Sequence, residues 1–329
     1  MALIWNVNST TAYVLGDSYL TSSAMESCRK LWKWERFSYF HESKDVHLVS
    51  SCNGLICLCD NKEWTGGAVT VVNPATGDTL PVPPLPVSKL SVRSHGAKIW
   101  QEAYNFAYHP TTGKYKVVHV PCKCDPIFVF KTVQVFTLGE KTWRDVPAPA
   151  NARCKLAVGI VSIDGMTHLV RTGSRRTVVS FDLDAECIVS TTGLPPLPDR
   201  RESYQLTAVH GRLGLVTTSQ DVWVLENRRR WSHRYNLGHR VPLPQFVYGE
   251  HVITWQGRSF YTHQLRSGPL SAGWRQRSKS DNTMVRIGRR DEGMLVAYMN
   301  CNNYQMFAYV KTMEPLSVYS TNYSTPSVP

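Results

Sequence analysis

Cysteine and histidine are the residues of this chain whose chemistry could bind a metal or attack a substrate. The closest approach to a metal site is two cysteine pairs with one intervening residue, Cys57-x-Cys59 and Cys122-x-Cys124. Zinc-binding pairs usually have two or more intervening residues, and alternate residues of a strand point to the same face. The spacing favours buried or half-buried thiols, and we expect no metal site.

Motifs of enzymes that activate a nucleophile or hold a phosphate are not found in the sequence. There is no Gly-x-Ser-x-Gly, no Gly-x4-Gly-Lys-Ser/Thr, no Gly-x-Gly-x-x-Gly and no His-Glu-x-x-His. None of the eleven histidines forms a paired motif, and His109 and His210 lie beside expected turns. We therefore expect no catalytic residues and no cofactor.

The charge of the chain is strongly positive. Its 329 residues include 37 Lys and Arg against 25 Asp and Glu, a formal net charge of +12. Such a charge favours acidic partners and raises non-specific affinity for nucleic acid. The basic residues are scattered in short groups, which favours solvated hairpin tips over a nucleic-acid groove. These groups are Arg175-Arg176, Arg200-Arg201, Arg228 to Arg230 and Arg289-Arg290.

The cysteine count and the N-terminus indicate the compartment. Nine unevenly spaced cysteines do not suggest a paired disulfide framework, so a reducing environment fits better. The N-terminus lacks the basic start and long apolar run of a secretory signal, and no stretch approaches eighteen apolar residues. We expect a cytoplasmic or nuclear protein with no membrane partner.

The elements that must position any binding residue are short strands. From about Val46 the chain consists of runs rich in Val, Ile, Leu, Tyr and Phe, separated by Gly, Pro, Asn and Asp. Six similar runs begin at residues 69, 133, 178, 222, 260 and 306, so successive starts are 64, 45, 44, 38 and 46 residues apart. The usual interval for one four-stranded propeller blade is roughly 40 to 50 residues. The long first interval contains a Pro-, Ser- and Lys-rich stretch between Pro83 and Glu102, which we interpret as an inserted loop.

Each run begins a hairpin whose second strand is often opened by tryptophan, as at Trp143, Trp231 and Trp274. A second hairpin precedes it, with turns such as Asp164-Gly165 and His210-Gly211. Two hairpins per repeat give four strands. The sequence therefore predicts an all-β, closed, kelch-like β-propeller of six blades, with seven as the alternative.

Closure of such a ring avoids unpaired sheet edges. It would use either residues near Asn6 to Val14 or the tail from Leu316 to Ser320, and the sequence does not decide between them. Before the repeats, Ser23-Ala-Met-Glu26 has the spacing of a helix capping box, followed by apolar residues at roughly helical intervals up to Phe37. We expect one short N-terminal helix there.

Four segments in order resemble the plant F-box-associated, kelch-like proteins. They are Ser51 to Leu58, Asn73-Pro-Ala-Thr76, Tyr108 to Val118 (Tyr-His-Pro-Thr-Thr-Gly-Lys-Tyr-Lys-Val-Val) and Val133 to Arg144, which ends in Trp-Arg. The resemblance covers about Val46 to Trp274. It implies a domain that recruits a target protein to an SCF-type ubiquitin ligase, while an F-box module docks on the Skp adaptor.

The resemblance divides the chain into three parts. We expect an N-terminal extension at 1–45, an F-box-associated propeller domain at 46–320 and a flexible tail at 321–329. Residues 1–45 do not show the Leu-Pro-x-Glu-Leu opening of an F-box, so the Skp adaptor is a doubtful partner for this chain. Either the receptor domain stands alone, as a scaffold or competitor, or the chain is part of a longer protein. An enzyme using the central channel would instead need carboxylates or histidines clustered at the channel mouth.

Binding residues of a propeller are expected on the loops that join second to third strands and one blade to the next. Aromatic and arginine side chains there make good contact anchors. The predicted partner is an unknown protein, with an acidic surface favoured by the net charge. The candidate residues are Trp64, Arg93, Trp100, Lys123, Asp125, Arg175, Arg176 and Arg258, and Arg228 and Arg229 should lie on the opposite face.

Overall fold

In the computed structural model, most of the described residues lie in antiparallel sheets. The described residues are 1–7, 10–16, 35–38, 45–62, 66–86, 100–121, 130–173, 175–197, 203–227, 229–267, 294–298 and 304–320. They fall into two compact units. The first unit holds the strands up to residue 193 and the last strand of the chain; the second holds the strands between residues 194 and 302.

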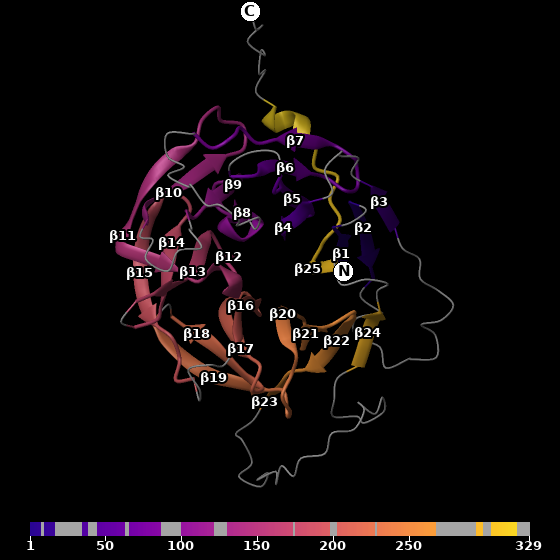
Figure 1. The fold of residues 1–329 in the computed structure, drawn as a ribbon, viewed down its shortest axis with the longest axis vertical. Helices are drawn as coiled ribbons and strands as arrows, with labels where there is room; N and C mark the ends of the chain where they lie inside the picture. Colours follow the sequence, from indigo (N-terminus) through magenta and orange to yellow (C-terminus); the bar gives the residue numbers. More distant parts are fainter. Residues whose placement is uncertain are drawn as a thin grey trace, which may run out of the picture. The chain divides into compact units, whose positions relative to one another are not determined.

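The first unit contains three sheets (Figure 1). One has the order β25-β1-β2-β3, one the order β4-β5-β6-β7, and one is an eight-stranded sheet in which β8 to β11 continue into β13, β14 and β15, with β12 paired to β13. The strands are β1 Ala2–Asn6, β2 Thr11–Leu15, β3 Glu35–Ser38, β4 Val46–Cys52, β5 Leu55–Asp60, β6 Ala68–Val72, β7 Thr79–Pro81, β8 Tyr104–His109, β9 Lys114–His119, β10 Phe130–Thr137, β11 Arg144–Cys154, β12 Val161–Ile163, β13 Met166–Thr172, β14 Thr177–Asp182, β15 Cys187–Gly193 and β25 Tyr304–Ala308.

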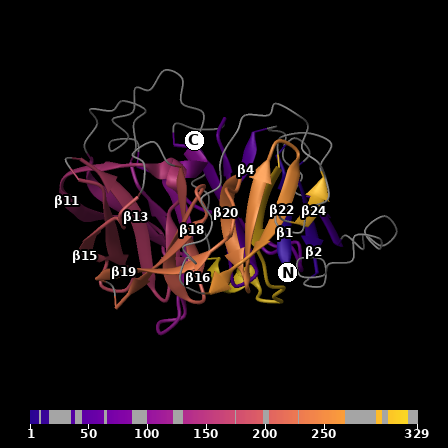
Figure 2. The same cartoon turned by 90° about the horizontal axis from the view of Figure 1, so that it is seen from below.

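The second unit contains two sheets, ordered β16-β17-β18-β19-β23 and β20-β21-β22-β24. Figure 2 shows β24 beside β22, with which it pairs. The strands are β16 Tyr204–Val209, β17 Arg212–Thr217, β18 Asp221–Glu226, β19 Arg230–Asn236, β20 Leu243–Tyr248, β21 His251–Gln256, β22 Ser259–Gln264, β23 Arg266–Ser267 and β24 Met294–Tyr298.

These sheets are the blades of a β-propeller, as the sequence predicts. In the first unit the first strands of successive four-stranded groups lie in contact: β25 with β4, β4 with β8, and β8 with β12; in the second unit β16 contacts β20. Residues on both faces of a strand are apolar, because each group packs against a neighbouring group on either side. Leu55 and Cys57 of β5, for example, share a buried cluster with Phe106 and Tyr115 of β8 and β9.

The predicted number of blades is wrong. The described strands form five hydrogen-bonded sheets rather than six or seven. The difference arises at β11, an eleven-residue strand whose last two residues pair with β13, joining β8–β11 and β12–β15 into one sheet. A strand long enough to reach the next group is not distinguishable, by composition, from one that stops short.

The predicted position of the sixth repeat is also wrong. The first five runs are the third strands of four-stranded groups (β6, β10, β14, β18 and β22), as predicted. The sixth run lies in β25, which pairs with β1 in full register from Ala2–Ala308 to Asn6–Tyr304. Residues 294–298 form β24, which pairs with β22. Of the two expected routes of closure, the N-terminal strands therefore provide the pairing, whereas Leu316–Tyr319 is a short 3-10 helix.

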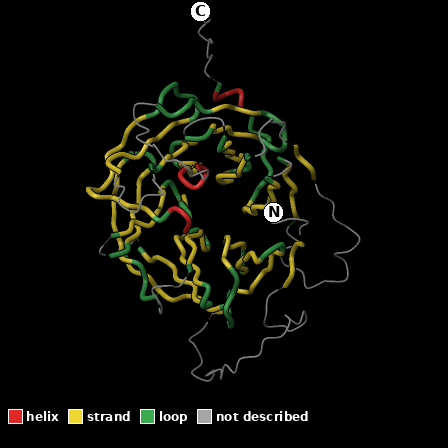
Figure 3. Tube along the Cα trace, in the orientation of Figure 1, coloured by secondary structure: helices red, strands yellow, loops and turns green. Residues whose placement is uncertain are grey.

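The expected N-terminal helix is not supported by the structure. Residues 17–34 lie outside the described part, and Phe37, expected on the helix, lies in strand β3. Pairing with β2 fixes this segment as strand, which local helical spacing could not reveal. The helices of the described residues are short 3-10 turns, drawn red in Figure 3. They include η3 (Trp100–Ala103), η4 (Leu156–Val158) and η5 (Leu316–Tyr319). The division at residue 45 and the flexible tail at 321–329 stay predictions.

The predicted tight turns have the expected backbone geometry. At Asp164-Gly165 the φ angles are 48° and 73°, and at His210-Gly211 they are 47° and 72°. Two successive positive φ values are typical of the type I′ hairpin turn, which matches the twist of the flanking strands. These turns link β12 to β13 and β16 to β17.

Each four-stranded group has two unlike ends. We call the end with the turns from first to second and from third to fourth strand its turn end. The opposite end, which carries the connection from second to third strand and the passage to the next group, is its loop end. Among the described residues, no helix combines the length and apolar character needed to span a membrane.

Candidate interaction surface

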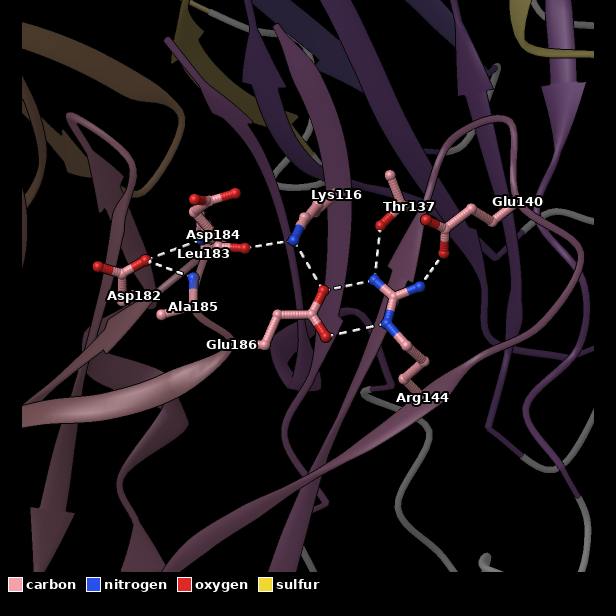
Figure 4. A network of polar contacts seen from close by, with 9 residues as sticks. All are labelled: Lys116, Thr137, Glu140, Arg144, Asp182, Leu183, Asp184, Ala185 and Glu186. Atoms are coloured by element: carbon pink, nitrogen blue, oxygen red, sulfur yellow. Dashed lines mark hydrogen bonds and ion pairs between the residues drawn. The ribbon is translucent and has the colours of Figure 1, made fainter. Parts of the chain in front are cut away.

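At the turn ends of the eight-stranded sheet, an ion-pair network ties its two halves together (Figure 4). Lys116 of β9 donates from Nζ to Glu186 Oε1 at 2.7 Å and to the carbonyl oxygen of Leu183. Arg144, at the start of β11, donates from Nε to Glu186 Oε2 at 2.9 Å and from Nη2 to Oε1. Glu186, in the β14–β15 turn, thus holds two cations of the neighbouring half.

Burial makes this network a structural element. The Lys116 side chain is 5% exposed and that of Glu186 18%. Burial alone would raise the pKa of Glu186, but hydrogen bonds from Arg144 and Lys116 outweigh it and hold the pKa below its ordinary value. Arg144 also donates to Thr137 Oγ1 at 2.8 Å and pairs with Glu140.

Both cations belong to the sequence motifs quoted above: Lys116 to Tyr-Lys-Val-Val and Arg144 to Trp-Arg. The neighbouring Trp143 donates from Nε1 to the carbonyl oxygen of Pro83 at 2.7 Å and packs on Phe136 with ring centroids 5.5 Å apart. This contact seals β10 and β11 against the chain that leaves β7. Trp143, which directly precedes β11, therefore anchors the hairpin of β10 and β11 by packing.

Other motif residues hold the C-terminal segment. We call residues 309–319 the C-terminal strap, which in Figure 1 runs from β25 to the short helix η5 beside β7. Asn73 donates from Nδ2 to the carbonyl oxygen of Glu314 at 2.8 Å, and the Tyr115 hydroxyl donates to Glu314 Oε2 at 2.8 Å. Leu316 is buried in the cluster formed by β5 and β8. The motifs thus assemble the scaffold at the turn ends.

The loop ends of the first unit are organised differently. Beyond β5, Asn61 donates from Nδ2 to Gln101 Oε1 at 2.7 Å, and the Gln101 backbone N–H donates to Asn61 Oδ1 at 3.3 Å. The Tyr104 hydroxyl donates to the carbonyl oxygen of Gly66 at 2.6 Å. These bonds fix the bases of the loops that contain Trp64 and Arg93. Rigid bases with long connections are typical of binding surfaces.

The predicted residues are distributed as follows. Arg175 and Arg176 are exposed in the β13–β14 loop, and Arg258 is exposed in the β21–β22 turn of the second unit. Each position joins a second strand to a third, the topological place predicted for it. Trp100 is the first residue of η3. Arg229 is exposed in the β18–β19 turn, a turn end, as expected. Trp64, Arg93, Lys123, Asp125 and Arg228 lie outside the described residues.

The structure brings one further basic residue to this surface. Lys155 directly follows β11, and its backbone N–H donates to the carbonyl oxygen of Val170 in β13 at 2.9 Å. The Lys155 side chain is half-buried; burial lowers its pKa, and the positive charge of Arg176 lowers it further. Nothing in the sequence around Lys155 distinguishes it, because its neighbourhood depends on the β11–β13 pairing.

Burial keeps two cysteines of β4 and β5 in the uncharged thiol form. No group of three or more His, Cys, Asp or Glu within the described ranges could hold a metal ion. Burial raises the pKa of Cys52 to about 12 and that of Cys57 far above its ordinary value. A thiol must ionise to act as a nucleophile or metal ligand, so these thiols have structural roles.

Comparison with known proteins agrees with this geometry. Residues 17–248 match the family described as the F-box associated beta propeller domain. The chain is 26% identical over 234 residues to the F-box protein At3g07870 of Arabidopsis thaliana, a match covering 60% of this chain and 52% of that protein. The chain therefore spans about half the length of the curated relative it matches.

Two solved structures are distantly similar to this chain. TolB from Acinetobacter baumannii is 11% identical with a TM-score of 0.44, covering 81% of this chain and 60% of that one. The beta-propeller domain of the Trilobed protease from Pyrococcus furiosus is 10% identical with a TM-score of 0.36, covering 68% and 71%. The family match extends over more than half of the chain. It includes the motif residues that form the ion-pair network and those that hold the strap. This chain belongs to the family of F-box associated β-propeller domains.

Proposed function

We propose that this chain is the substrate-recognition domain of an SCF-type ubiquitin ligase. It captures a target protein through its loop ends, and the target is ubiquitinated when an F-box module supplies contact with the Skp adaptor. The observation that carries the proposal is the family match over residues 17–248, and the relative named an F-box protein supports it.

The turn ends and the loop ends of the sheets carry side chains with different roles, and this difference supports binding as the activity. The motif residues Asn73, Tyr115, Lys116 and Arg144 are engaged in scaffold contacts at the turn ends. Arg175 and Arg176 are exposed on a loop end instead. An interaction domain needs this combination of a rigid frame with side chains free to vary at its rim.

We further propose a kelch-like propeller that works in the cytoplasm or nucleus, because nine unevenly spaced cysteines do not suggest a disulfide framework and fit a reducing compartment better. A stand-alone scaffold or competitor is the second candidate. Capture of a target through the exposed arginines of the loop end would serve this role as well.

The test compares this chain with a fusion that carries an F-box at its N-terminus. Each is mixed with the Skp adaptor and the remaining ligase components, and ubiquitin transfer to proteins captured by the propeller is measured. The proposal expects transfer by the fusion and none by the same F-box without the propeller. Capture of the same proteins without transfer by the fusion would favour the scaffold.

A loop-end variant provides the second arm. Replacing Trp64, Trp100, Arg175 and Arg176 with alanine should abolish capture while leaving the thermal unfolding curve nearly unchanged. A large loss of stability would show that these residues support the fold, and unchanged capture would place the binding surface elsewhere.

A further inference from the structure

The junction that makes one sheet eight-stranded also assembles a basic cluster. Arg153 of β11 pairs with Thr172 of β13 and Cys154 with Arg171, and the Lys155 N–H continues this pairing to Val170. On the other side of β13, Arg171 lies opposite Thr177 of β14, which directly follows Arg176. Lys155 and the β13–β14 loop therefore flank the same end of one strand.

Basic residues predominate in the stretch of sequence that forms this junction. Residues 151–176 include five Lys or Arg and a single acidic residue, Asp164. Asp164 lies in the β12–β13 turn, at the opposite end of the strands. Arg175 and Arg176 are exposed, and Lys155 and Arg171 are half-buried. The positive charge of Arg176 is close enough to Lys155 to disfavour the Lys155 cation.

Basic groups held close together create a positive potential that attracts an anion. Guanidinium groups bind carboxylate and phosphate groups through paired charge-assisted hydrogen bonds, and an ammonium group adds a compact positive charge. Within the described part of this loop end, the cluster consists of one loop and the residue that flanks it. A nucleic-acid strand would be served better by basic residues along an extended track.

We propose that Lys155, Arg175 and Arg176 form the docking site for an acidic segment of the target protein, recognised through its carboxylate or phosphate groups. This inference rests on the proposed function, because it names the chemistry of the target at the same loop end. The sequence indicates Arg175 and Arg176 only as candidates, and the β11–β13 junction adds Lys155 to them.

The test measures fluorescence anisotropy of a labelled twelve-residue glutamate-rich peptide, the same peptide with phosphoserines, and a lysine-rich counterpart. Loss of two charge-assisted contacts should weaken acidic-peptide binding by R175E/R176E at least about tenfold. K155M should weaken it about threefold or more, because the methionine keeps the apolar stem and removes the charge. The lysine-rich peptide should not bind. Tighter binding of the phosphoserine peptide would identify phosphate as the preferred group, and equal binding would identify carboxylate.

R229E/R230E is the matched control. It makes the same change in net charge at two exposed arginines of the second unit, Arg229 in the β18–β19 turn and Arg230 at the start of β19. The control should alter binding less than about twofold, because net charge by itself contributes little to binding when salt screens it at physiological ionic strength. An equal loss of binding in the control would show that net charge alone explains the effect, and it would overturn the proposed docking site. Tighter binding of a single-stranded oligonucleotide of equal charge than of either peptide would overturn the protein-partner assignment.

The ubiquitin-transfer assay separates this inference from the proposed function. Transfer by the F-box fusion that is lost with R175E/R176E supports both. Transfer that R175E/R176E leaves unchanged overturns the acidic docking site while the proposed function stands. No transfer by the unaltered fusion overturns the proposed function, and peptide binding then decides the site by itself.

Discussion

Replacing Glu186 with glutamine should destabilise the fold more than replacing Lys116 with methionine, although the two residues share one ion pair. Glu186 is bound by both Lys116 and Arg144. In K116M the carboxylate keeps its two bonds from Arg144, whose side chain is 36% exposed. In E186Q the buried ammonium group of Lys116 loses its carboxylate partner and keeps the carbonyl oxygen of Leu183.

The magnitudes follow from burial. Removing one partner of a buried pair costs about 3–5 kcal/mol when it leaves the other charge uncompensated. A neutral amide can still accept one hydrogen bond, so we expect about 3 kcal/mol for E186Q. For K116M we expect about 1 kcal/mol, because the apolar stem remains packed and the carboxylate remains paired. The double variant holds no unpaired buried charge and should cost at least about 1 kcal/mol less than the sum.

The assay is urea unfolding followed by tryptophan fluorescence for the four proteins of this double-mutant cycle. E226Q is a matched control, because Glu226 is also bound by two arginines, Arg212 and Arg234, but these are 57% and 53% exposed. Exposed pairs contribute little, so E226Q should leave the unfolding midpoint nearly unchanged. A cost of E186Q no larger than that of K116M, or strictly additive costs, would refute the assignment of Lys116 as a buried cation dependent on Glu186.

Two further predictions concern the strap and the buried histidine His119. G54A should be more destabilising than G77A by about 1–3 kcal/mol in urea unfolding: both glycines have φ near +80°, but a Cβ at Gly54 would lie 2.5 Å from the carbonyl oxygen of Val310 in the strap, whereas Gly77 has open space. Equal costs would show that the strap yields to the added methyl group. Burial lowers the pKa of His119 from 6.5 to about 4, although its hydrogen bond with Gln134 opposes the shift; its contribution to stability is therefore present above pH 6.5 and is lost as the pH falls towards 4. Over that window the slope of unfolding free energy against pH should be lower in H119Q by up to about 1.4 kcal/mol per pH unit, and an unchanged slope would contradict the neutral, buried state of His119.

Much of the fold could be predicted from the chain because strands and turns are encoded locally. Alternation of apolar residues and the Asp-Gly and His-Gly turns placed five third strands correctly, together with the hairpins that the first four of them begin. The fifth hairpin was expected to continue at Trp274, whereas β22 pairs with residues 294–298. A turn that requires positive φ at two successive residues is specified by those residues themselves. The family resemblance was equally local, since its motifs are contiguous segments.

The tertiary structure alone decided which distant segments share a sheet and which charges meet. Local spacing at Phe37 suggested a helix, and pairing with β2 makes it a strand. The run beginning at Met306 repeated the pattern of a third strand, yet β25 pairs with the N-terminus. The position of Lys116 in β9 follows the ordinary alternation of strand residues and does not reveal an ion pair. Only the approach of the β14–β15 turn brings a carboxylate partner to its buried ammonium group. Lys155 joins Arg176 because β11 extends far enough to pair with β13. Such contacts depend on hydrogen bonding between segments remote in sequence, and the composition of neither segment records its partner.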